Sequence, residues 1–174
     1  MSAGGAGTAR LAVIADAAAI AHIYNQGIED GIATFETEPR TSAQVAAQLA
    51  EKGDRHPTVV VERDGVVIAW AAVSAYRARP CYAGTGEHSV YVERGVRGTG
   101  AGRVALEALF RACEDRGFWK LVSRIFPENR ASLALHERTG FRVVGVYHRH
   151  GKVGGVWRDC VIVEKLLGDP PAEI

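Results

Sequence analysis

Apolar residues recur along the chain at two spacings, and each spacing predicts one kind of element. The run RLAVI at residues 10–14 predicts a short strand, and apolar positions from Ile20 to Ile28 then repeat near the 3.6-residue period of a helix. Asp16 stands just before this periodic stretch, so we expect its side chain to cap the helix. The chain therefore opens with a strand followed by a helix.

A second helix and a hairpin are expected next. Val45 to Leu49 form a short amphipathic stretch, for which Thr41 or Ser42 is the expected N-terminal cap. Residues 58–76 contain two runs rich in β-branched residues, joined by Asp64-Gly65. An Asp-Gly pair favours the type I′ turn, because both central residues of that turn have positive φ. We therefore predict a β-hairpin that turns at this pair.

The second half of the chain alternates strands with two more helices. An apolar face recurs at helical spacing from Leu106 to Cys113, and Gly117 is placed to end that helix. Asn129 is a candidate cap for the other helix, and Gly140 is placed to end it. Strands are expected at residues 87–93, 119–125, 141–148 and 157–167.

This order of elements predicts the fold class. A strand, a helix and another strand surround the glycine-rich stretch at residues 95–102, which resembles a βαβ unit, while the hairpins elsewhere are antiparallel. We therefore expect a single-domain α/β (α+β) fold with a mixed, mostly antiparallel sheet of about seven strands, flanked by about four helices. The domain is expected over residues 9–167, with a flexible N-terminal segment at 1–8 and a C-terminal tail at 168–174.

Composition narrows the class of protein. The chain has 174 residues, of which 47% are hydrophobic, and its net charge is +1. No global charge would attract nucleic acid or an anionic membrane, so neither is an expected partner. The longest apolar run, Val66 to Val73, is too short to cross a bilayer, and the first residues do not resemble a secretory signal, so we expect a cytoplasmic protein. The three cysteines lack metal or disulfide spacing and are expected to be reduced, partly buried thiols.

The glycine-rich loop is the most informative stretch for function. Its backbone N–H groups can approach an anion closely at the start of a helix, where the helix dipole favours negative charge. The same glycines would also suit a plain helix-entry loop that needs close packing. The loop lacks the Gly-Lys-Ser/Thr ending of a P-loop, since Ala101 follows Gly100. It also lacks the last glycine of a dinucleotide-binding GxGxxG, because Arg103 and Ala105 occupy the two possible positions.

A different pattern does fit the loop. Arg97, Gly100 and Gly102 match Arg/Gln-x-x-Gly-x-Gly/Ala, which resembles the acetyl-CoA pyrophosphate loop of the GCN5-related N-acetyltransferase (GNAT) superfamily. The loop follows an apolar strand, and N-x-x-S-x-x-L-H-x-x-x-G-F at residues 129–141 is similar to the superfamily's second cofactor motif. The stretches at 23–41, 77–92 and 155–159 also resemble the phosphinothricin N-acetyltransferase group, which includes acetyltransferases of methionine sulfoximine and arsinothricin.

The resemblance implies an acetyl-CoA-dependent N-acetyltransferase and the residues that would contact acetyl-CoA, its co-substrate. The strand before the loop would pair with the pantetheine arm, although a β-bulge usual in the family leaves open whether Val90 or Val92 faces the donor. No metal is implied, and a homodimer is expected because relatives often dimerise. The residues expected to bind acetyl-CoA are Val90, Tyr91, Val92, Arg97, Gly98, Thr99, Gly100, Ala101, Gly102, Asn129 and Ser132.

Acetylation of an amine needs a base, because an α-amino group has a pKa of about 8 and must lose a proton before or during attack. Glu87 matches the glutamate to which the family assigns this role, acting directly or through a water. It could otherwise be an ordinary strand-edge glutamate. His88 is a secondary candidate. His136 occupies the place where many relatives have a proton-donating tyrosine, so it is the expected acid for the departing thiol, or a histidine that only packs against the sheet.

The acceptor is expected to be a small amino acid or a toxic analogue of one. Arg77 and Arg79 lie on a loop before the strand that carries Glu87, and a guanidinium group suits carboxylate or phosphinate oxygens. Both could instead be solvated surface residues. Glu29, Thr34 and Phe35 match the family's pocket wall. Acetylation of a protein N-terminus or a polyamine, and a non-catalytic acetyl-CoA-binding module, are the alternative functions.

Three features near the C-terminus leave their roles open. Lys152 lies one residue earlier than the lysine that usually precedes Gly-x-Trp in the phosphinothricin group, so its substrate role is in doubt. Trp157 and Asp159 suit a core and a turn as well as they suit a site. His148 and His150 could share a strand face, but no carboxylate or cysteine in the sequence completes a metal site with them.

Overall fold

The computed structural model describes residues 5–170, and residues 1–4 and 171–174, within the expected N-terminal segment and tail, lie outside them. Within these residues, seven strands and four α-helices follow one another in the order that the sequence predicts. Their bounds, in chain order, are β1 (Thr8–Leu11), α1 (Ala17–Asp30), α2 (Ser42–Lys52), β2 (Thr58–Arg63), β3 (Val66–Ala75), β4 (Thr85–Val92), α3 (Ala101–Glu114), β5 (Lys120–Ile125), α4 (Arg130–Arg138), β6 (Arg142–Val153) and β7 (Val156–Leu166).

All seven strands form one mixed sheet in the order β1-β2-β3-β4-β5-β7-β6. Five of the six neighbouring pairs are antiparallel, and β4 and β5 form the single parallel pair. A parallel pair needs a crossover connection, which α3 provides on its way from β4 to β5. The predicted α/β fold with a mostly antiparallel sheet of seven strands and four helices is therefore confirmed.

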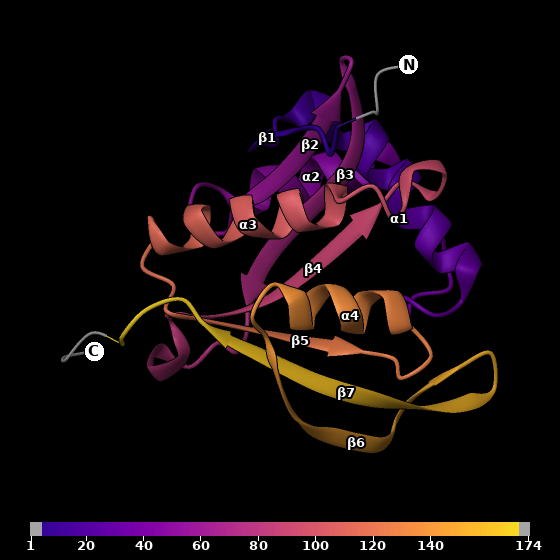
Figure 1. Ribbon diagram of the computed structural model, residues 1–174, viewed down its shortest axis with the longest axis vertical. Coiled ribbons are helices and arrows are strands. Elements are labelled where there is room, and N and C mark those ends of the chain that lie inside the picture. Colours follow the sequence, from indigo (N-terminus) through magenta and orange to yellow (C-terminus); the bar gives the residue numbers. More distant parts are fainter. Residues whose placement is uncertain (1–4, 171–174) are drawn as a thin grey trace.

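Helices cover both faces of the sheet. Helices α3 and α4 lie on one face, and α1 and α2 lie behind it (Figure 1). Beneath α3, Leu106 and Leu109 are fully buried against β2, β3 and β5 in the larger core. On the other face, Ile20 and Ile23 of α1 pack against Trp70 of β3. The helical spacing of these apolar positions in the sequence corresponds to the faces that the sheet covers.

Several predicted turns and caps are confirmed. Asp64 and Gly65 both have positive φ, 53° and 76°, as the type I′ hairpin turn requires. Thr41 accepts a hydrogen bond from the backbone N–H of Gln44 and so caps α2. Asn129 caps α4 by accepting from the backbone N–H of Ser132. Local side-chain chemistry was sufficient to place these three features.

Asp16 does not cap α1 with its side chain as predicted. Its carboxylate accepts hydrogen bonds from the Val13 backbone N–H at 2.8 Å and from Arg10 at 2.7 and 2.8 Å. The Arg10 guanidinium lowers the pKa of this carboxyl group, although burial opposes the shift. The direct contact with Arg10 therefore holds the carboxylate away from the start of α1. The first strand ends at Leu11 rather than running to Ile14.

The sheet splits between β4 and β5. Their pairing covers only Thr85 to Glu87, after which the two strands diverge (Figure 1). The β3–β4 register runs without a shift from Gly86 to Val92, so the β-bulge expected in this strand is absent from the β3–β4 pairing. Alternation therefore holds along β4, and both Val90 and Val92 pack on the α3 side of the sheet. Beyond Glu87, the edge of β4 that faces β5 is unpaired.

Other predicted features have mixed outcomes. Cys113 and Cys160 are buried free thiols as expected, but Cys81 is exposed. Burial raises the pKa of the Cys113 thiol to about 12, which keeps it protonated. Within residues 5–170, no helix is both long enough and apolar enough to span a bilayer.

Candidate active site

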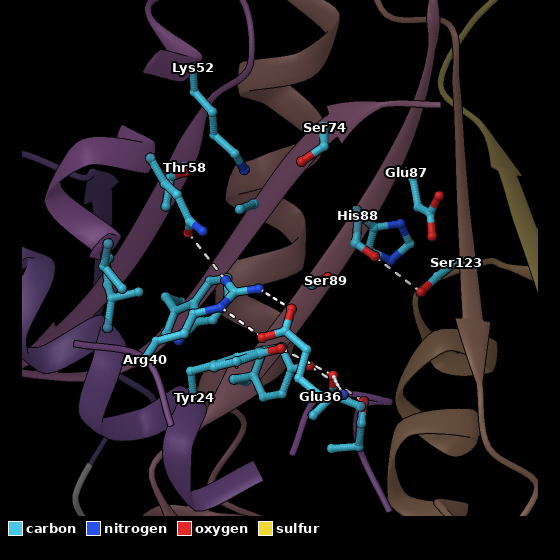
Figure 2. Close-up of a pocket in the computed structure, with 18 of the residues that line it drawn as sticks. Tyr24, Glu36, Arg40, Lys52, Thr58, Ser74, Glu87, His88, Ser89 and Ser123 are labelled. Atoms are coloured by element: carbon cyan, nitrogen blue, oxygen red, sulfur yellow. Dashed lines mark hydrogen bonds and ion pairs between the residues drawn. The ribbon is translucent and has the colours of Figure 1, made fainter. Parts of the chain in front are cut away.

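Two adjoining pockets occupy the place where the sheet splits. The larger, about 530 Å³, lies on the α1 and α2 side and is walled by those helices, the loop between them and β2 to β5 (Figure 2). The smaller, about 50 Å³, lies between β4 and β5 and reaches the start of α4. Ser89, Ser123, Arg124 and Phe126 belong to both linings. A molecule in the larger pocket can therefore meet another that enters through the split.

Glu87 lies in the wall of the larger pocket, opposite Ser74 of β3 (Figure 2). Its Oε1 accepts hydrogen bonds from Nε of Arg124 at 2.9 Å and from a terminal guanidinium nitrogen at 2.5 Å. Both donors use the same oxygen, so Oε2 has no hydrogen-bond partner within the described part of the chain. A carboxylate with one oxygen fixed and the other open can accept a proton from a molecule in the pocket.

His88 points to the opposite side of β4 from Glu87 and meets His136 of α4. The two Nε2 atoms are 2.9 Å apart, and both rings are 2% exposed. The Nδ1 of His88 lies 3.1 Å from the Val122 carbonyl oxygen, and the Nδ1 of His136 lies 2.7 Å from the Ser132 carbonyl oxygen. Burial lowers the pKa of both imidazoles, and the proximity of His136 lowers that of His88 further. The pair is therefore a buried link between β4 and α4, in which burial disfavours the charged form of each ring.

The glycine-rich loop adopts the conformation that its composition suggests. Gly98 and Gly100 have φ values of +82° and +92°, a left-handed region that other residues rarely adopt. A Cβ atom at Gly98 would meet no heavy atom within 4 Å, so the space in front of it is open. Ala101 and Gly102 form the first turn of α3, whose N–H groups have no intrahelical acceptor. The loop therefore presents free donors and open space to an anion.

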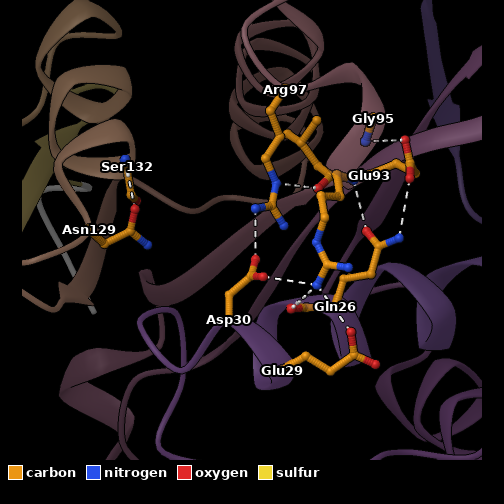
Figure 3. Close-up of polar contacts among 10 residues, drawn as sticks. Gln26, Glu29, Asp30, Glu93, Gly95, Arg97, Asn129 and Ser132 are labelled. Carbon is orange, nitrogen blue, oxygen red and sulfur yellow. Dashed lines mark hydrogen bonds and ion pairs between the residues drawn. The ribbon is translucent and has the colours of Figure 1, made fainter.

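Polar contacts hold this loop against the end of α1 (Figure 3). Arg97 pairs with Asp30 at 2.7 Å and donates to the Val92 carbonyl oxygen at 3.2 Å. Gln26 accepts from the Arg94 backbone N–H at 2.9 Å and donates to Glu93 at 3.2 Å. The predicted cofactor residue Arg97 is thus fixed by α1 beside the loop. The hydroxyl of Thr99 donates to the Val96 carbonyl oxygen at 2.7 Å and tightens the turn.

The other residues expected to contact acetyl-CoA lie in different surroundings. Val90, Asn129 and Ser132 line the smaller pocket. Tyr91 lines both pockets, but its ring turns toward α1 and stacks on Trp70. Val92 is partly buried and packs against the core under α3. The structure thus brings most of these residues to the split between β4 and β5.

Residues expected to bind the acceptor are only partly brought together. Thr34 and Phe35 line the larger pocket, and Phe35 packs edge-on against Phe126 at 4.7 Å. Glu29 lies outside that lining and pairs with Arg94 beside the glycine-rich loop. Arg77 and Arg79 also lie outside it.

Arg77 stacks over Tyr76 at 5.2 Å on the loop after β3. Proximity in the chain to the strand that carries Glu87 therefore did not place either arginine at the pocket in this single chain.

Three cations that no sequence pattern indicated line the larger pocket. Arg40 comes from the loop before α2, Lys52 is the last residue of α2, and Arg124 lies on β5. Arg40 stacks over Tyr24 at 4.2 Å and pairs with Glu36. In the sequence, each of the three resembles an ordinary polar residue at the edge of an element. Only the packing of α2 over the sheet brings them to one cavity.

Features near the C-terminus belong to the β6–β7 hairpin. The Nδ1 of His148 lies 3.0 Å from Oδ2 of Asp159, so a carboxylate does adjoin one of the two histidines. Asp159 also accepts from the backbone N–H of Arg149 at 2.8 Å, within the irregular part of the β6–β7 pairing between Tyr147 and Gly151. Trp157 is exposed, and Lys152 lies over its ring at 5.9 Å. Within residues 5–170, no group of three or more histidine, cysteine or acidic side chains could hold a metal ion.

Comparisons with known proteins show the family of this chain. The model of the acetyltransferase (GNAT) family matches residues 18–141. Phosphinothricin N-acetyltransferase from Alcaligenes faecalis is 35% identical over 154 residues, which cover 87% of this chain and 78% of that protein. The L-methionine sulfoximine/L-methionine sulfone acetyltransferase of Salmonella typhimurium is 33% identical over 170 residues, which cover 95% of this chain and 97% of that protein.

Solved structures give the same result. A GNAT superfamily phosphinothricin acetyltransferase from Sinorhizobium meliloti, in complex with acetyl-CoA, superposes with a TM-score of 0.88 at 32% identity, covering 97% of this chain and 95% of that one. The structure of YncA from Salmonella typhimurium with its cofactor acetyl-CoA has a TM-score of 0.91 at 30% identity, covering 96% of this chain and 97% of that one.

Proposed function

Because this chain belongs to the acetyltransferase (GNAT) family, we propose that it acetylates the α-amino group of a small amino acid or a toxic analogue of one. The analogues that relatives suggest are phosphinothricin and methionine sulfoximine. The meeting of the two pockets beside Ser89 and Glu87 carries this proposal. It allows a donor in the split and an acceptor on the α1 and α2 side to react directly.

The residues around the split fit acetyl-CoA, which supplies the acetyl group as a thioester. Open space at Gly98, its left-handed backbone and the free N–H groups of the first turn of α3 suit a pyrophosphate. The unpaired edge of β4 from Ser89 onward offers backbone donors and acceptors to an extended amide-containing arm. A backbone N–H on this edge also suits the negative charge that develops on a carbonyl oxygen.

Glu87 is the proposed general base. Oε2 is open to the larger pocket while Oε1 is held by Arg124, so the carboxylate is oriented and still able to receive a proton. In this role Glu87 takes a proton from the acceptor's ammonium group, directly or through a water, and leaves a neutral nitrogen that can attack. Its position in the wall of the pocket rather than at a distant edge supports this role over a purely structural one.

We propose that His136 assists departure of the thiol through a hydrogen bond, because burial disfavours the charged imidazole that could give up a proton. Its Nε2 faces His88, and its Nδ1 faces the Ser132 carbonyl oxygen at 2.7 Å and the Ser132 hydroxyl at 3.3 Å. Since both nitrogens contact the protein, His136 would act by way of the Ser132 hydroxyl, which can donate a hydrogen bond to the departing sulfur. Ser132 lines the smaller pocket, which supports this path.

The proposal extends to the oligomeric state and the location of the protein. We propose a homodimer, supported by exposed apolar side chains on the β6–β7 hairpin, and a cytoplasmic location, where acetyl-CoA is available. Sedimentation or light scattering would test the dimer. The exposed apolar residues of this hairpin are Val143, Val144, Val146, Tyr147, Val156 and Trp157.

A panel assay tests the function. Purified protein with acetyl-CoA is offered proteinogenic amino acids, phosphinothricin, methionine sulfoximine, arsinothricin, polyamines and an N-terminal peptide, with thiol release and product mass as readouts. We expect acetylation of α-amino acids and little turnover of polyamines. Turnover confined to the peptide or polyamines would contradict the proposal, and binding of CoA without any acetylation would indicate a non-catalytic module.

A further inference from the structure

Lys52 is a cation without a counter-ion inside the larger pocket. Its Nζ donates to the Val73 carbonyl oxygen at 3.0 Å, which leaves two further N–H donors. Within residues 5–170, no carboxylate lies within 4 Å of this ammonium group. Burial lowers the pKa of Lys52 to about 8, and the nearby charge of Arg40 contributes to the shift. The lysine is thus held at a site where a positive charge is unfavourable unless an anion joins it.

The other two cations of the pocket are already paired. Arg40 contacts Glu36, and Arg124 contacts Glu87. Glu51 is on the same helix as Lys52 and has no ion pair with it. His56 lies close enough for Lys52 to lower its pKa, although burial has the larger effect. Lys52 is therefore the one pocket cation whose charge nothing in the described chain balances.

Arg40 can assist Lys52. Its guanidinium group donates to Glu36 through Nε at 2.9 Å and through a terminal nitrogen, and to Gln48 at 3.2 Å. Three of its five N–H donors are thereby used, and two are left for a ligand. Figure 2 shows Lys52 and Arg40 approaching the same space from α2 and from the preceding loop.

The site lies close to the proposed base. Lys52 donates a hydrogen bond to the carbonyl oxygen of Val73. The next residue of β3, Ser74, lies opposite Glu87 of β4. One strand spacing, about 4.8 Å, thus separates the strand that Lys52 contacts from the strand that carries Glu87. Lys52 and Glu87 both line the larger pocket, so one small molecule there can present its amine to Glu87 and its oxyanion to Lys52.

We propose that Lys52, assisted by Arg40, binds an oxyanion of the acceptor, an inference that rests on the proposed function. The oxyanion is either the α-carboxylate or an acidic group on the side chain of the amino acid. Lys52 then serves as a specificity-determining residue, and it supplies the anion-binding role that the sequence suggested for Arg77 and Arg79. A point charge on a flexible stem adapts to carboxylate and phosphinate alike.

Steady-state kinetics of Lys52→Met distinguish the two oxyanions. Acceptors would be phosphinothricin, methionine sulfone and the α-amides of both. We expect KM to rise roughly tenfold to a hundredfold with little change in kcat, because a charged hydrogen bond is lost. A rise for both free acids and neither amide assigns the α-carboxylate, and a rise for phosphinothricin and its amide alone assigns the side chain. An equal rise for all four acceptors, or no rise, would overturn the proposal.

Two further variants control for folding. Lys52→Arg keeps the charge and should recover most of the affinity, whereas a merely structural role would not depend on charge. Lys165→Met removes a lysine on β7, outside the pocket, and should leave KM unchanged. Thermal unfolding of all variants shows whether the fold is intact.

Chemical labelling separates this inference from the proposed function. Acetic anhydride at pH 8 should modify the Lys52 amine, and saturating phosphinothricin in the presence of CoA should protect it, as read by peptide mass spectrometry. Protection without turnover would refute the proposed function and sustain the site. Turnover of amino acids without protection and without a KM effect would refute the site alone.

Discussion

The Nε2 atoms of His88 and His136 lie 2.9 Å apart in the interior, and each ring has its Nδ1 within hydrogen-bond distance of a carbonyl oxygen. Three contacts need three hydrogens, but two neutral imidazoles carry only two. A third proton would complete the set, yet burial opposes the positive charge it brings. The two effects therefore compete directly in the response of this pair to pH.

We expect burial to prevail, so the free energy of unfolding should fall as the pH drops from 7 to 5. Burial lowers the pKa of both rings in the folded chain, whereas the unfolded histidines titrate near pH 6.5. Below that pH the unfolded chain binds more protons than the folded one. The loss is up to about 1.4 kcal/mol per pH unit for each ring. Denaturant unfolding at several pH values measures it.

The variant His88→Gln isolates the contribution of the pair from that of the carboxylates. It should unfold at lower denaturant at pH 7, by about 1–3 kcal/mol, since His136 loses its partner. Its stability should also fall less steeply between pH 7 and 5. His150→Gln removes an exposed ring and should leave the slope unchanged. A wild-type stability that rises toward pH 5 would mean that the folded pair takes up the third proton.

The fold could be predicted from the sequence because its signals are local. The periodicity of apolar residues from Leu106 to Cys113, the Asp64-Gly65 turn and the Asn129 cap each depend on residues close together in the chain. The His88–His136 contact joins residues 48 positions apart, and no local pattern indicates it. Alternation alone did place His88 on the opposite face of the strand from Glu87, which the structure confirms.

The acceptor pocket could be predicted only in part, because residues far apart in the chain form it. Thr34 and Phe35 were carried over from a family motif and do line it. The position of Arg77 before the strand that carries Glu87 suggests a place at the pocket, but packing and not chain distance sets the path of a loop. Lys52 is the last residue of a helix, where lysine is common in proteins. No pattern in the sequence therefore predicts that its side chain lies over β3.

Replacing Glu87 by glutamine should slow the reaction without weakening the binding of acetyl-CoA. The amide keeps the shape and the hydrogen bond from Arg124 but cannot take a proton, so kcat should fall roughly 10²–10⁴-fold. Stopped-flow or steady-state kinetics with a saturating amino acid measure this, and calorimetry measures the affinity for CoA. The variant Glu137→Gln alters an exposed residue of α4 and should keep full activity. A kcat for Glu87→Gln within a factor of about three of wild type would remove Glu87 from the base role.

The glycine-rich loop offers a matched pair of substitutions. Gly98 and Gly31 have φ of +82° and +70°, and a Cβ at either would meet nothing within 4 Å. Alanine at each position should cost about 1–2 kcal/mol of stability through the same backbone strain. Only Gly98→Ala should weaken CoA binding, because only that methyl group would occupy the space in front of the loop. Equal CoA affinities in calorimetry would contradict the assignment of this loop to the pyrophosphate.

Gly151 and Phe35 connect the β6–β7 hairpin to the acceptor pocket. A Cβ at Gly151 would overlap the Phe35 ring, whose other side is held by Phe126 at 4.7 Å. Gly151→Ala should therefore displace Phe35, reduce stability by about 1–3 kcal/mol and raise the KM for the acceptor several-fold, with the KM for acetyl-CoA unchanged. Gly145→Ala, on the same strand with open space, is the control. Adding Phe35→Leu to Gly151→Ala should restore stability by relieving the overlap, and failure to do so would show that the hairpin is not held by this contact.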